Sequence, residues 1–274
     1  MPTRRGAFYH PGPVVDLHAH ILPGIDDGPA DLEESIGVAR EAAADGVVTL
    51  AATPHLRHDY PSVPLHELAQ RCAKLNEHLD RAGIPLHVEP GGEVDILWAQ
   101  QATAEDLKAA TFGQRGSDLL LETPYGALPP AFEELVFRLS AQGLRLLLAH
   151  PERSPTFQRD PGRLAALVRR GVLVQVTSGS LAKADKRSAS RRMALSLVEQ
   201  GLAHVISSDA HTAALGRPPG LSAGVAAAAE VAPARARWMV TDAPAAILAG
   251  ERLPPPPAEA RSRPWLRRLL RRSS

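Results

Sequence analysis

The sequence predicts an α/β protein in which seven parallel strands form a closed or nearly closed barrel surrounded by helices. Seven apolar runs of strand length recur along the chain, and helix-like stretches separate most of them. Several of these stretches end just before a glycine, the usual residue of a left-handed helix cap. Strands that alternate with helices favour parallel pairing through right-handed crossovers. Seven such strands favour a barrel over a small open sheet.

The elements are justified in chain order by their apolar patterns and end signals. The strands are expected at Val14–His18, Val47–Ala52, Leu86–Glu89, Asp118–Glu122, Arg145–Ala149, Val172–Val176 and Ala203–Ser207. The helices are expected at Glu33–Ala44, Leu65–Arg81, Ala131–Gln142, Gly162–Arg170 and Ala189–Gln200. The first helix follows Asp31, which is expected to form a capping box with Glu34. The glycines just past the helix ends are Gly46, Gly83, Gly143, Gly171 and Gly201.

Composition narrows the class of protein. The 274 residues include 31 Lys and Arg against 30 Asp and Glu, and this near-neutral balance argues against a nucleic-acid binder with a broad basic face. A single cysteine, Cys72, excludes a disulfide framework within the chain. We find no apolar run long enough to span a bilayer and no signal-peptide pattern at the N-terminus, so a cytoplasmic location is expected.

The chain divides into one large domain and a short tail. We place the domain at residues 12–250, and a Pro-rich linker with a basic tail at residues 251–274. Residues 261–274 contain six Arg and no acidic residue. Trp265, Leu266, Leu269 and Leu270 share one face of a helical pattern, which is typical of a peripheral membrane helix at an anionic surface. A solvated basic tail is the equal alternative.

Potential metal ligands follow six of the seven predicted strands at their carboxyl ends, which form the mouth of an α/β barrel, where active sites are built. These residues are His18, His20, His55, Glu93, Glu122, His150, Asp209 and His211. Asp27, in the loop after the first strand, can reach over the mouth, although Asp26 lies beside it. Five His and four carboxylates are too many for one tetrahedral zinc ion and suit two or three divalent ions that share a carboxylate bridge. Imidazole and carboxylate ligands fit Mn, Fe or Zn.

Several short motifs contain these residues and lie in a specific order along the chain. They are Asp16-Leu17-His18-Ala19-His20, Leu22-Pro23-Gly24-Ile25-Asp26-Asp27-Gly28, Ala52-Thr53-Pro54-His55, Gly91-Gly92-Glu93, Leu121-Glu122, Ala149-His150-Pro151-Glu152-Arg153, Ser207-Ser208-Asp209-Ala210-His211 and Gly216-Arg217-Pro218-Pro219. Over about residues 14–250, this series resembles the bacterial protein-tyrosine phosphatases of the PHP superfamily, the capsule and exopolysaccharide regulators of the CpsB/YwqE type.

The resemblance implies a distorted (β/α)7 TIM-like barrel, the PHP fold, with three divalent ions that are commonly Mn²⁺. It assigns His18, His20, Glu93 and Asp209 to one ion. It assigns Glu93, Glu122 and His150 to a second ion, and Asp27, His55 and His211 to the third. Arg153 matches the arginine that binds the substrate phosphate, and Arg217 matches a further motif position near the substrate. Arg153, Asp209 and His211 are the implied catalytic residues.

The implied reaction is hydrolysis of phosphotyrosine by attack of a metal-activated hydroxide. The implied substrate is the phosphotyrosine-containing tail of a membrane-associated bacterial tyrosine kinase of capsular or exopolysaccharide synthesis. This would place the protein in the cytoplasm, with peripheral contact at the inner face of the membrane as one alternative. The sequence is compatible with an oligomer as well as a monomer.

Two other functions keep the same metal ligands. One is hydrolysis of a small phosphate monoester such as histidinol phosphate, and the other is a non-catalytic, metal-stabilised interaction module. Cysteine-based phosphatase chemistry is excluded, because that mechanism needs an Arg six residues after the Cys and His78 stands there. We expect Cys72 to lie on the buried face of its helix.

Overall fold

The computed structural model describes residues 12–212 and 216–259; the basic tail at 261–274 lies outside the described residues. Its strands form two parallel sheets with the orders β1-β2-β4 and β3-β5-β6-β7-β8-β9. The strands are β1 Val14–Ala19, β2 Val47–Ala52, β3 His55–Leu56, β4 His87–Pro90, β5 Glu93–Val94, β6 Asp118–Glu122, β7 Arg145–Ala149, β8 Leu173–Thr177 and β9 Val205–Ser207.

Two bends join the sheets into one ring. Strand β3 begins three residues after β2 ends, and β5 begins three residues after β4 ends, so each pair is one strand that crosses from the first sheet to the second. At the other seam, the Asp209 N–H donates to the carbonyl of His18 at 2.9 Å, and the His20 N–H donates to the carbonyl of Ala210 at 2.7 Å. Seven chain segments therefore surround the axis, which confirms the predicted distorted barrel.

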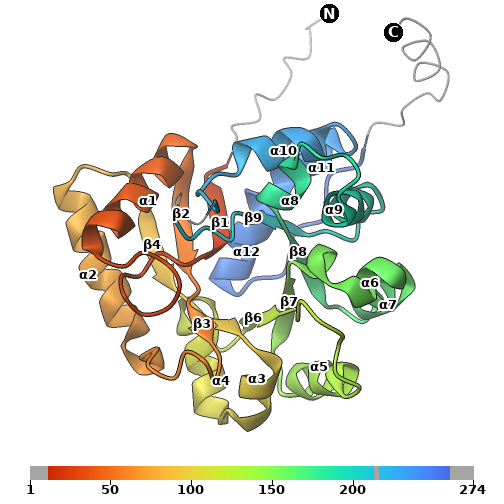
Figure 1. The fold of residues 1–274 in the computed structure, drawn as a ribbon, viewed down its shortest axis with the longest axis horizontal. Helices are drawn as coiled ribbons and strands as arrows, with labels where there is room; N and C mark the ends of the chain where they lie inside the picture. The colour runs from red at the N-terminus through yellow and green to blue at the C-terminus, as the bar shows by residue number, and fades with distance from the viewer. Residues whose placement is uncertain (1–11, 213–215, 260–274) are drawn as a thin grey trace, which may run out of the picture.

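Helices pack around this ring, most of them on its outer side (Figure 1). They are α1 Leu32–Ala44, α2 Leu68–Arg81, α3 Ile96–Gln101, α4 Ala104–Ala110, α5 Phe132–Ala141, α6 Pro155–Arg159, α7 Pro161–Arg169, α8 Ser178–Ala182, α9 Ala189–Glu199, α10 Ser222–Ala229, α11 Pro233–Trp238 and α12 Asp242–Ala249. All five predicted helices and all seven predicted strands are present, most with ends shifted by one or two residues. The five predicted end glycines all have positive φ. The capping box is only half formed, because Glu34 accepts from the Ala30 N–H rather than from Asp31.

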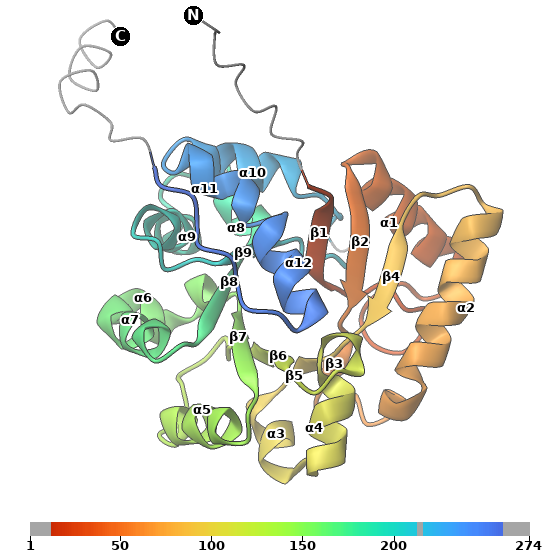
Figure 2. The same cartoon turned by 180° about the vertical axis from the view of Figure 1, so that it is seen from behind.

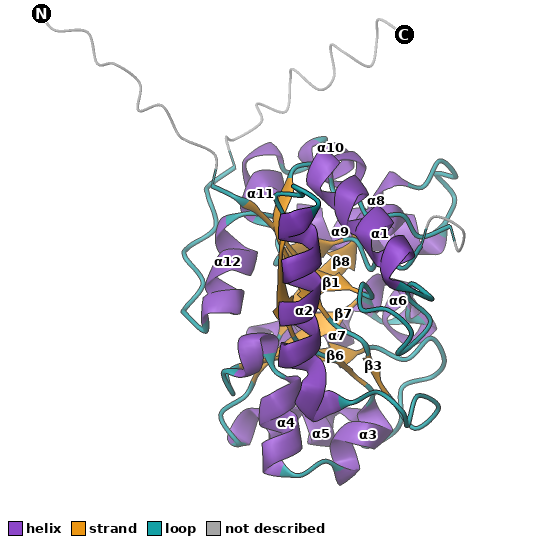
Figure 3. Ribbon diagram, turned by 90° about the vertical axis from the view of Figure 1, so that its left-hand side faces the viewer, coloured by secondary structure: helices purple, strands orange, loops and turns teal. Residues whose placement is uncertain are grey.

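The barrel interior is apolar at the end opposite the mouth. Leu147 points inward and packs with Leu17, Phe112 and Val205, whereas its neighbours Leu146 and Leu148 belong to the outer core beneath the helices. Helix α12 adds Ile247 to the inner cluster. Figure 2 shows α12 lying across the back of the barrel, and Figure 3 shows many of the connecting loops gathered on the opposite side of the strands. The structure thus has an apolar floor and a loop-built mouth.

The chain after α12 stays against the barrel as far as residue 259. Leu253 packs against both apolar clusters. The carboxylate of Glu259 accepts from the Arg235 N–H at 2.9 Å, at the start of α11. Within the described ranges, no helix combines the length and the apolar character needed to cross a bilayer.

His204 makes stability depend on pH at a site remote from the mouth. Its Nδ1 accepts from the Val174 N–H at 3.2 Å, and burial together with the charge of Arg235 lowers its pKa from 6.5 to about 4. Because the folded state resists protonation, stability present above pH ~6.5 is lost as pH falls toward 4. We expect His204→Asn, whose amide oxygen can accept the same bond at every pH, to remove roughly 1–2 kcal/mol of the acid-induced loss between pH 7 and 5. Urea unfolding of both proteins at the two pH values checks this, and parallel losses would contradict it.

Candidate metal centre

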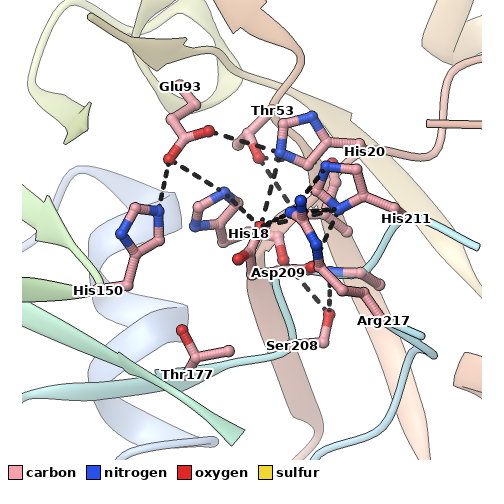
Figure 4. A network of polar contacts seen from close by, with 12 residues as sticks. His18, His20, Thr53, Glu93, His150, Thr177, Ser208, Asp209, His211 and Arg217 are labelled. Carbon is pink, nitrogen blue, oxygen red and sulfur yellow. Dashed lines mark hydrogen bonds and ion pairs between the residues drawn. The ribbon is translucent and has the colours of Figure 1, made fainter. Parts of the chain in front are cut away.

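The nine predicted ligands lie together at the mouth, delivered by the ends of different strands. Figure 4 shows six of them, His18, His20, Glu93, His150, Asp209 and His211. His18 lies near the end of β1 and His20 directly follows this strand. His55 begins β3, Glu93 begins β5 and Glu122 ends β6. His150 follows β7, and Asp209 and His211 follow β9. Eight of the nine residues are buried, and Asp27 is half-buried.

The nine side chains form four overlapping groups. Within each group, one donor atom from every residue lies within 4.8 Å of the others. The groups are His20–Asp27–His55–His211, His18–His20–Asp209, His18–Glu93–His150 and His55–Glu93–Glu122. His18, His20, His55 and Glu93 each belong to two groups, and Glu93 is the carboxylate among them, the kind of group that can bridge two ions. Three of the four residues in the first group are those assigned to one ion by the resemblance.

Local backbone conformation aims these side chains at the axis. His150 directly follows β7 and has a φ of 38°. Asp209 lies two residues after β9 and has a φ of 53°. Residues with a side chain rarely adopt this conformation, and its cost of about 1–3 kcal/mol is typical of functional sites. Gly28 allows the loop that carries Asp27 to fold back, because a Cβ there would lie 2.6 Å from the carbonyl oxygen of His20.

Asp26 and Asp27, adjacent in sequence, have different roles in the geometry. Asp27 faces the centre, with its Oδ1 3.1 Å from His211 Nε2 and 3.4 Å from His55 Nε2. Asp26 lies behind His20, with its Oδ2 2.6 Å from Nδ1 of that ring. A carboxylate in this position fixes the ring and leaves Nε2 directed at the centre.

The sequence analysis missed two residues that contact the predicted ligands. Gln175 in β8 places its Oε1 3.2 Å from His18 Nδ1 and accepts from the His150 N–H at 3.2 Å. Arg57 donates to the Glu122 carboxylate at 3.1 Å. A signal for Gln175 exists in the sequence, since it is a polar residue inside an otherwise apolar strand. Arg57 carries no such signal, because it lies in an irregular loop.

The unpartnered atoms of the centre fit divalent ions. His18 Nε2 and His20 Nε2 are buried without a hydrogen bond, and carboxylate oxygens lie 3.4 and 3.5 Å from them. His55 Nδ1 and Glu93 Oε2 lie 2.9 Å apart, also without hydrogen-bond geometry. Buried polar atoms are normally satisfied by hydrogen bonds, so nitrogen and oxygen atoms that converge in this way fit ligands for a cation. Imidazole nitrogens and carboxylate oxygens are the donors preferred by Mn, Fe and Zn.

The electrostatics indicate the same need for positive charge. Burial alone would raise the pKa of Glu93, but the charge on His18 and the hydrogen bond from His150 hold it well below its usual value. Burial and the neighbouring charge of Glu93 raise the pKa of Glu122 to about 8. A second carboxylate is therefore poorly tolerated beside Glu93 without a cation, and a bound divalent ion reverses that preference.

Two arginines meet at the edge of this centre. Arg153 Nη1 lies 2.5 Å from Asp209 Oδ2 and 3.0 Å from the Tyr125 hydroxyl. Arg217 Nη1 lies 3.1 Å from His211 Nε2 and 3.6 Å from Asp209 Oδ1. A cavity of about 640 Å³ opens beside both guanidinium groups, and Tyr125, Ser178 and Lys183 also line it.

Cys72 is unsuited to act as a nucleophile. It is buried on α2, and burial, with the charge of Glu89, raises the pKa of its thiol to about 12. The reactive thiolate is therefore absent near neutral pH.

The fold and the centre define the class: an α/β-barrel protein with a histidine and carboxylate cage at the carboxyl ends of its strands. The chain belongs to the family described as "Capsular polysaccharide synthesis, CpsB/CapC", whose profile matches residues 14–249.

Named relatives share most of the domain. The tyrosine-protein phosphatase YwqE of Bacillus subtilis is 35% identical over 199 residues, 72% of this chain and 77% of that protein. The putative tyrosine-protein phosphatase CapC of Staphylococcus aureus is 30% identical over 203 residues, 73% of this chain and 77% of that protein. A chain from the crystal structures of YwqE and of CpsB from Streptococcus pneumoniae, described as metal-dependent tyrosine phosphatases, superposes with a TM-score of 0.79 at 31% identity and covers 90% of this chain and 100% of that one.

The position of Asp26 leads to a prediction about metal affinity. Asp26→Asn removes the charge behind His20 but keeps every atom that faces the centre, so we expect Mn²⁺ affinity to fall by about 10- to 100-fold. Asp31→Asn is the matched control, because Asn also caps helices and Asp31 caps α1. Calorimetric Mn²⁺ titration of the chelator-treated proteins measures both. Equal affinities in the two variants would show that Asp26 does not support the centre.

The burial of Cys72 leads to a second prediction. Cys72→Ser should lower stability modestly and leave phosphate-ester turnover in the presence of Mn²⁺ within about twofold of the parent, because the thiol takes no part in the reaction. Phosphate release by the folded variant, verified by circular dichroism, checks this. A loss of turnover without a loss of fold would restore a cysteine mechanism.

Proposed function

We propose that this protein is a metal-dependent tyrosine-protein phosphatase that acts on phosphotyrosine of a bacterial tyrosine kinase of polysaccharide synthesis. The observation that carries the proposal is the convergence of nine potential metal ligands, one of which, Asp209, contacts both Arg153 and Arg217. These two arginines line the neighbouring cavity. The phosphatase names of the relatives and their shared family support the choice of reaction.

The proposed cofactor is a set of two or three divalent ions, with Mn²⁺ first and Fe or Zn as alternatives. The four groups of side chains described above would hold them. Bound there, such ions would activate water and draw negative charge from the phosphoryl oxygens.

Arg153 is the proposed phosphate-binding residue. Its guanidinium offers two parallel N–H donors, which match two oxygens of a phosphoryl group. The Tyr125 hydroxyl and Asp209 fix its position beside the centre. Arg217, which lies between β9 and α10, also approaches the Asp209 carboxylate and would supply further positive charge.

Asp209 and His211 complete the proposed catalytic set. One oxygen of Asp209 lies 3.4 Å from His18 Nε2, and the other contacts Arg153, so this side chain holds the metal cage and the arginine in one geometry. Burial lowers the pKa of His211 despite the neighbouring Asp27, which favours the neutral imidazole that can bind a metal ion.

Phosphotyrosine is a chemically suitable substrate for this arrangement. The phenol of tyrosine has a pKa of ~10, so its phenolate departs with little help from a general acid. Tyr125, which is 50% exposed at the cavity, offers a flat surface for an aromatic ring. The kinase substrate would be met in the cytoplasm.

The test of this function is phosphate release from a phosphotyrosine peptide. We expect turnover with Mn²⁺, its loss with a chelator and its recovery when Mn²⁺ is returned. Arg153→Ala should lower kcat/KM by about 10²- to 10³-fold, because it removes a positioned donor to the phosphoryl group. Arg159→Ala, which changes an exposed arginine of the nearby helix α6, is the control. Faster hydrolysis of histidinol phosphate than of the peptide, or turnover that a chelator leaves intact, would contradict the proposal.

A further inference from the structure

A strongly basic segment joins α8 to α9. Between residues 183 and 192, the chain has five cationic side chains and one acidic side chain, that of Asp185. Lys183, Lys186, Arg187 and Arg192 are exposed, and we call these four residues the basic rim. The side chain of Arg187 is 95% exposed.

Local contacts do not neutralise these charges. Lys183 Nζ donates to Ser190 Oγ at 2.9 Å and Arg192 donates to the carbonyl of Arg187, but both acceptors are uncharged. Arg191 and Arg192 lie in the first turn of α9, which contains no acidic residue. The N-terminal end of a helix carries a partial positive charge and favours anions, so cations there are locally unfavourable. Asp185 offsets little of this charge, because its Oδ1 accepts from the Arg187 backbone and lies 4.0 Å from the Arg187 Nε. A group outside the described chain would complement the remaining charge.

The topology places the basic rim at the mouth of the barrel. Helix α8 follows directly from the carboxyl end of β8, and α9 then returns toward the start of β9. The segment between these helices therefore lies on the same side as the candidate metal centre, and Figure 3 shows α8 on the side of the strands opposite to α12. Lys183 itself lines the cavity that contains Arg153 and Arg217.

The cavity wall continues this positive charge into the site. Arg153, Arg217 and Lys183 line it together with one carboxylate, Asp45. That carboxylate is already engaged, since its Oδ2 accepts from the Leu221 and Ser222 N–H groups at 2.6 and 2.9 Å. The cations thus form a continuous series from the phosphate-binding arginines to the basic rim.

The opposite side of the mouth has a different character. A second cavity of about 630 Å³ is lined there by Tyr60, Val63 and Trp98, with the acidic residues Glu67 and Asp106. The cation of that wall, Arg57, is paired with Asp59 and Glu122. Of these two cavities, the one on the α8–α9 side therefore attracts an anionic chain more strongly.

We propose that the basic rim binds an acidic segment of the substrate polypeptide on one side of its phosphotyrosine. This inference rests on the proposed phosphatase function and adds a preference for acidic sequence context. A polypeptide is favoured over a lipid surface because the rim is continuous with the cavity that receives the phosphoryl group. One extended chain can thus contact both.

The experiment compares peptides that differ only in charge. Each contains one phosphotyrosine, flanked on the N-terminal or the C-terminal side by three Glu or by three Gln. Hydrolysis with Mn²⁺ gives kcat/KM, and fluorescence anisotropy of the labelled peptides with chelator present gives affinity without turnover. The proteins are the parent, Lys186→Glu/Arg187→Glu, and the control Arg169→Glu/Arg170→Glu. This control reverses two adjacent exposed arginines at the end of α7, which precedes the start of β8 on the far side of the barrel.

For one of the two flanks, the parent protein should favour the Glu peptide over the matching Gln peptide by about five- to tenfold at low salt, in both kcat/KM and affinity. About 0.5 M salt should remove most of this preference, because exposed charges are screened. The rim variant should lose the preference, and the control should keep it. Circular dichroism verifies that both variants fold.

Three results would overturn or separate the claims. The ratio of kcat/KM for the acidic peptide to that for the neutral peptide decides the role of the basic rim. An equal ratio in the parent and the rim variant would overturn this role. Rim-dependent sedimentation with phosphatidylserine vesicles, without any peptide preference, would assign the rim to a membrane instead. If neither peptide releases phosphate, the phosphatase function fails, and the anisotropy ratios still decide whether the rim binds acidic chains.

Discussion

The contacts of Glu93 are the constraint on which the centre depends. Its carboxylate is fully buried and lies 2.9 Å from both His55 and His150 and 3.5 Å from both His18 and His20. Residues in or directly after three strands, β1, β3 and β7, must therefore meet around the Glu93 side chain of β5. The bend before β5 makes this meeting possible, and Gly92 favours it because a Cβ there would lie 2.5 Å from the buried side chain of Leu56, which would have to move. An isolated carboxylate in this position would be strongly unfavourable, so imidazoles and cations must accompany it.

The two ends of the barrel differ in composition: one end is packed with apolar side chains, and the other carries the polar residues of the candidate metal centre. Leu17, Leu147 and Ile247 close the far end with apolar packing that excludes water. At the near end, the same strands finish in residues that would be costly to bury alone. Strained residues such as Asp209 are tolerated at the mouth because the packed floor and the surrounding helices hold the strands in place.

Much of the fold could be predicted from the sequence because the strands alternate regularly with amphipathic helices. Gly46, Gly83 and the other glycines after the helices indicated the helix ends, because the left-handed cap conformation has a positive φ that glycine adopts readily. The bends at β3 and β5 could not be predicted, since two-residue strands have no period. Helices α10 and α12 were also missed, because their alanine-rich sequences have almost no polar face.

The site was predictable wherever a polar residue interrupts or ends an apolar run, as at Glu122 and His150. The different positions of Asp26, behind His20, and Asp27, facing the centre, were not predictable, because they depend on how the loop folds back over His20. Arg57 was missed for a related reason. Its contact with Glu122 joins residues 65 positions apart, and nothing in the neighbouring sequence indicates it.

The two oxygens of Asp209 have a thermodynamic consequence. One faces His18 and the other contacts Arg153, so a single carboxylate joins the candidate metal ligands to the proposed phosphate-binding arginine. A cation that draws electron density from this carboxylate weakens its hold on the guanidinium, and an anion that engages the guanidinium frees the carboxylate for the cation. If the site binds a metal ion and a phosphoryl group as proposed, the affinities for these two ligands would be coupled reciprocally through this one side chain, each strengthening the other.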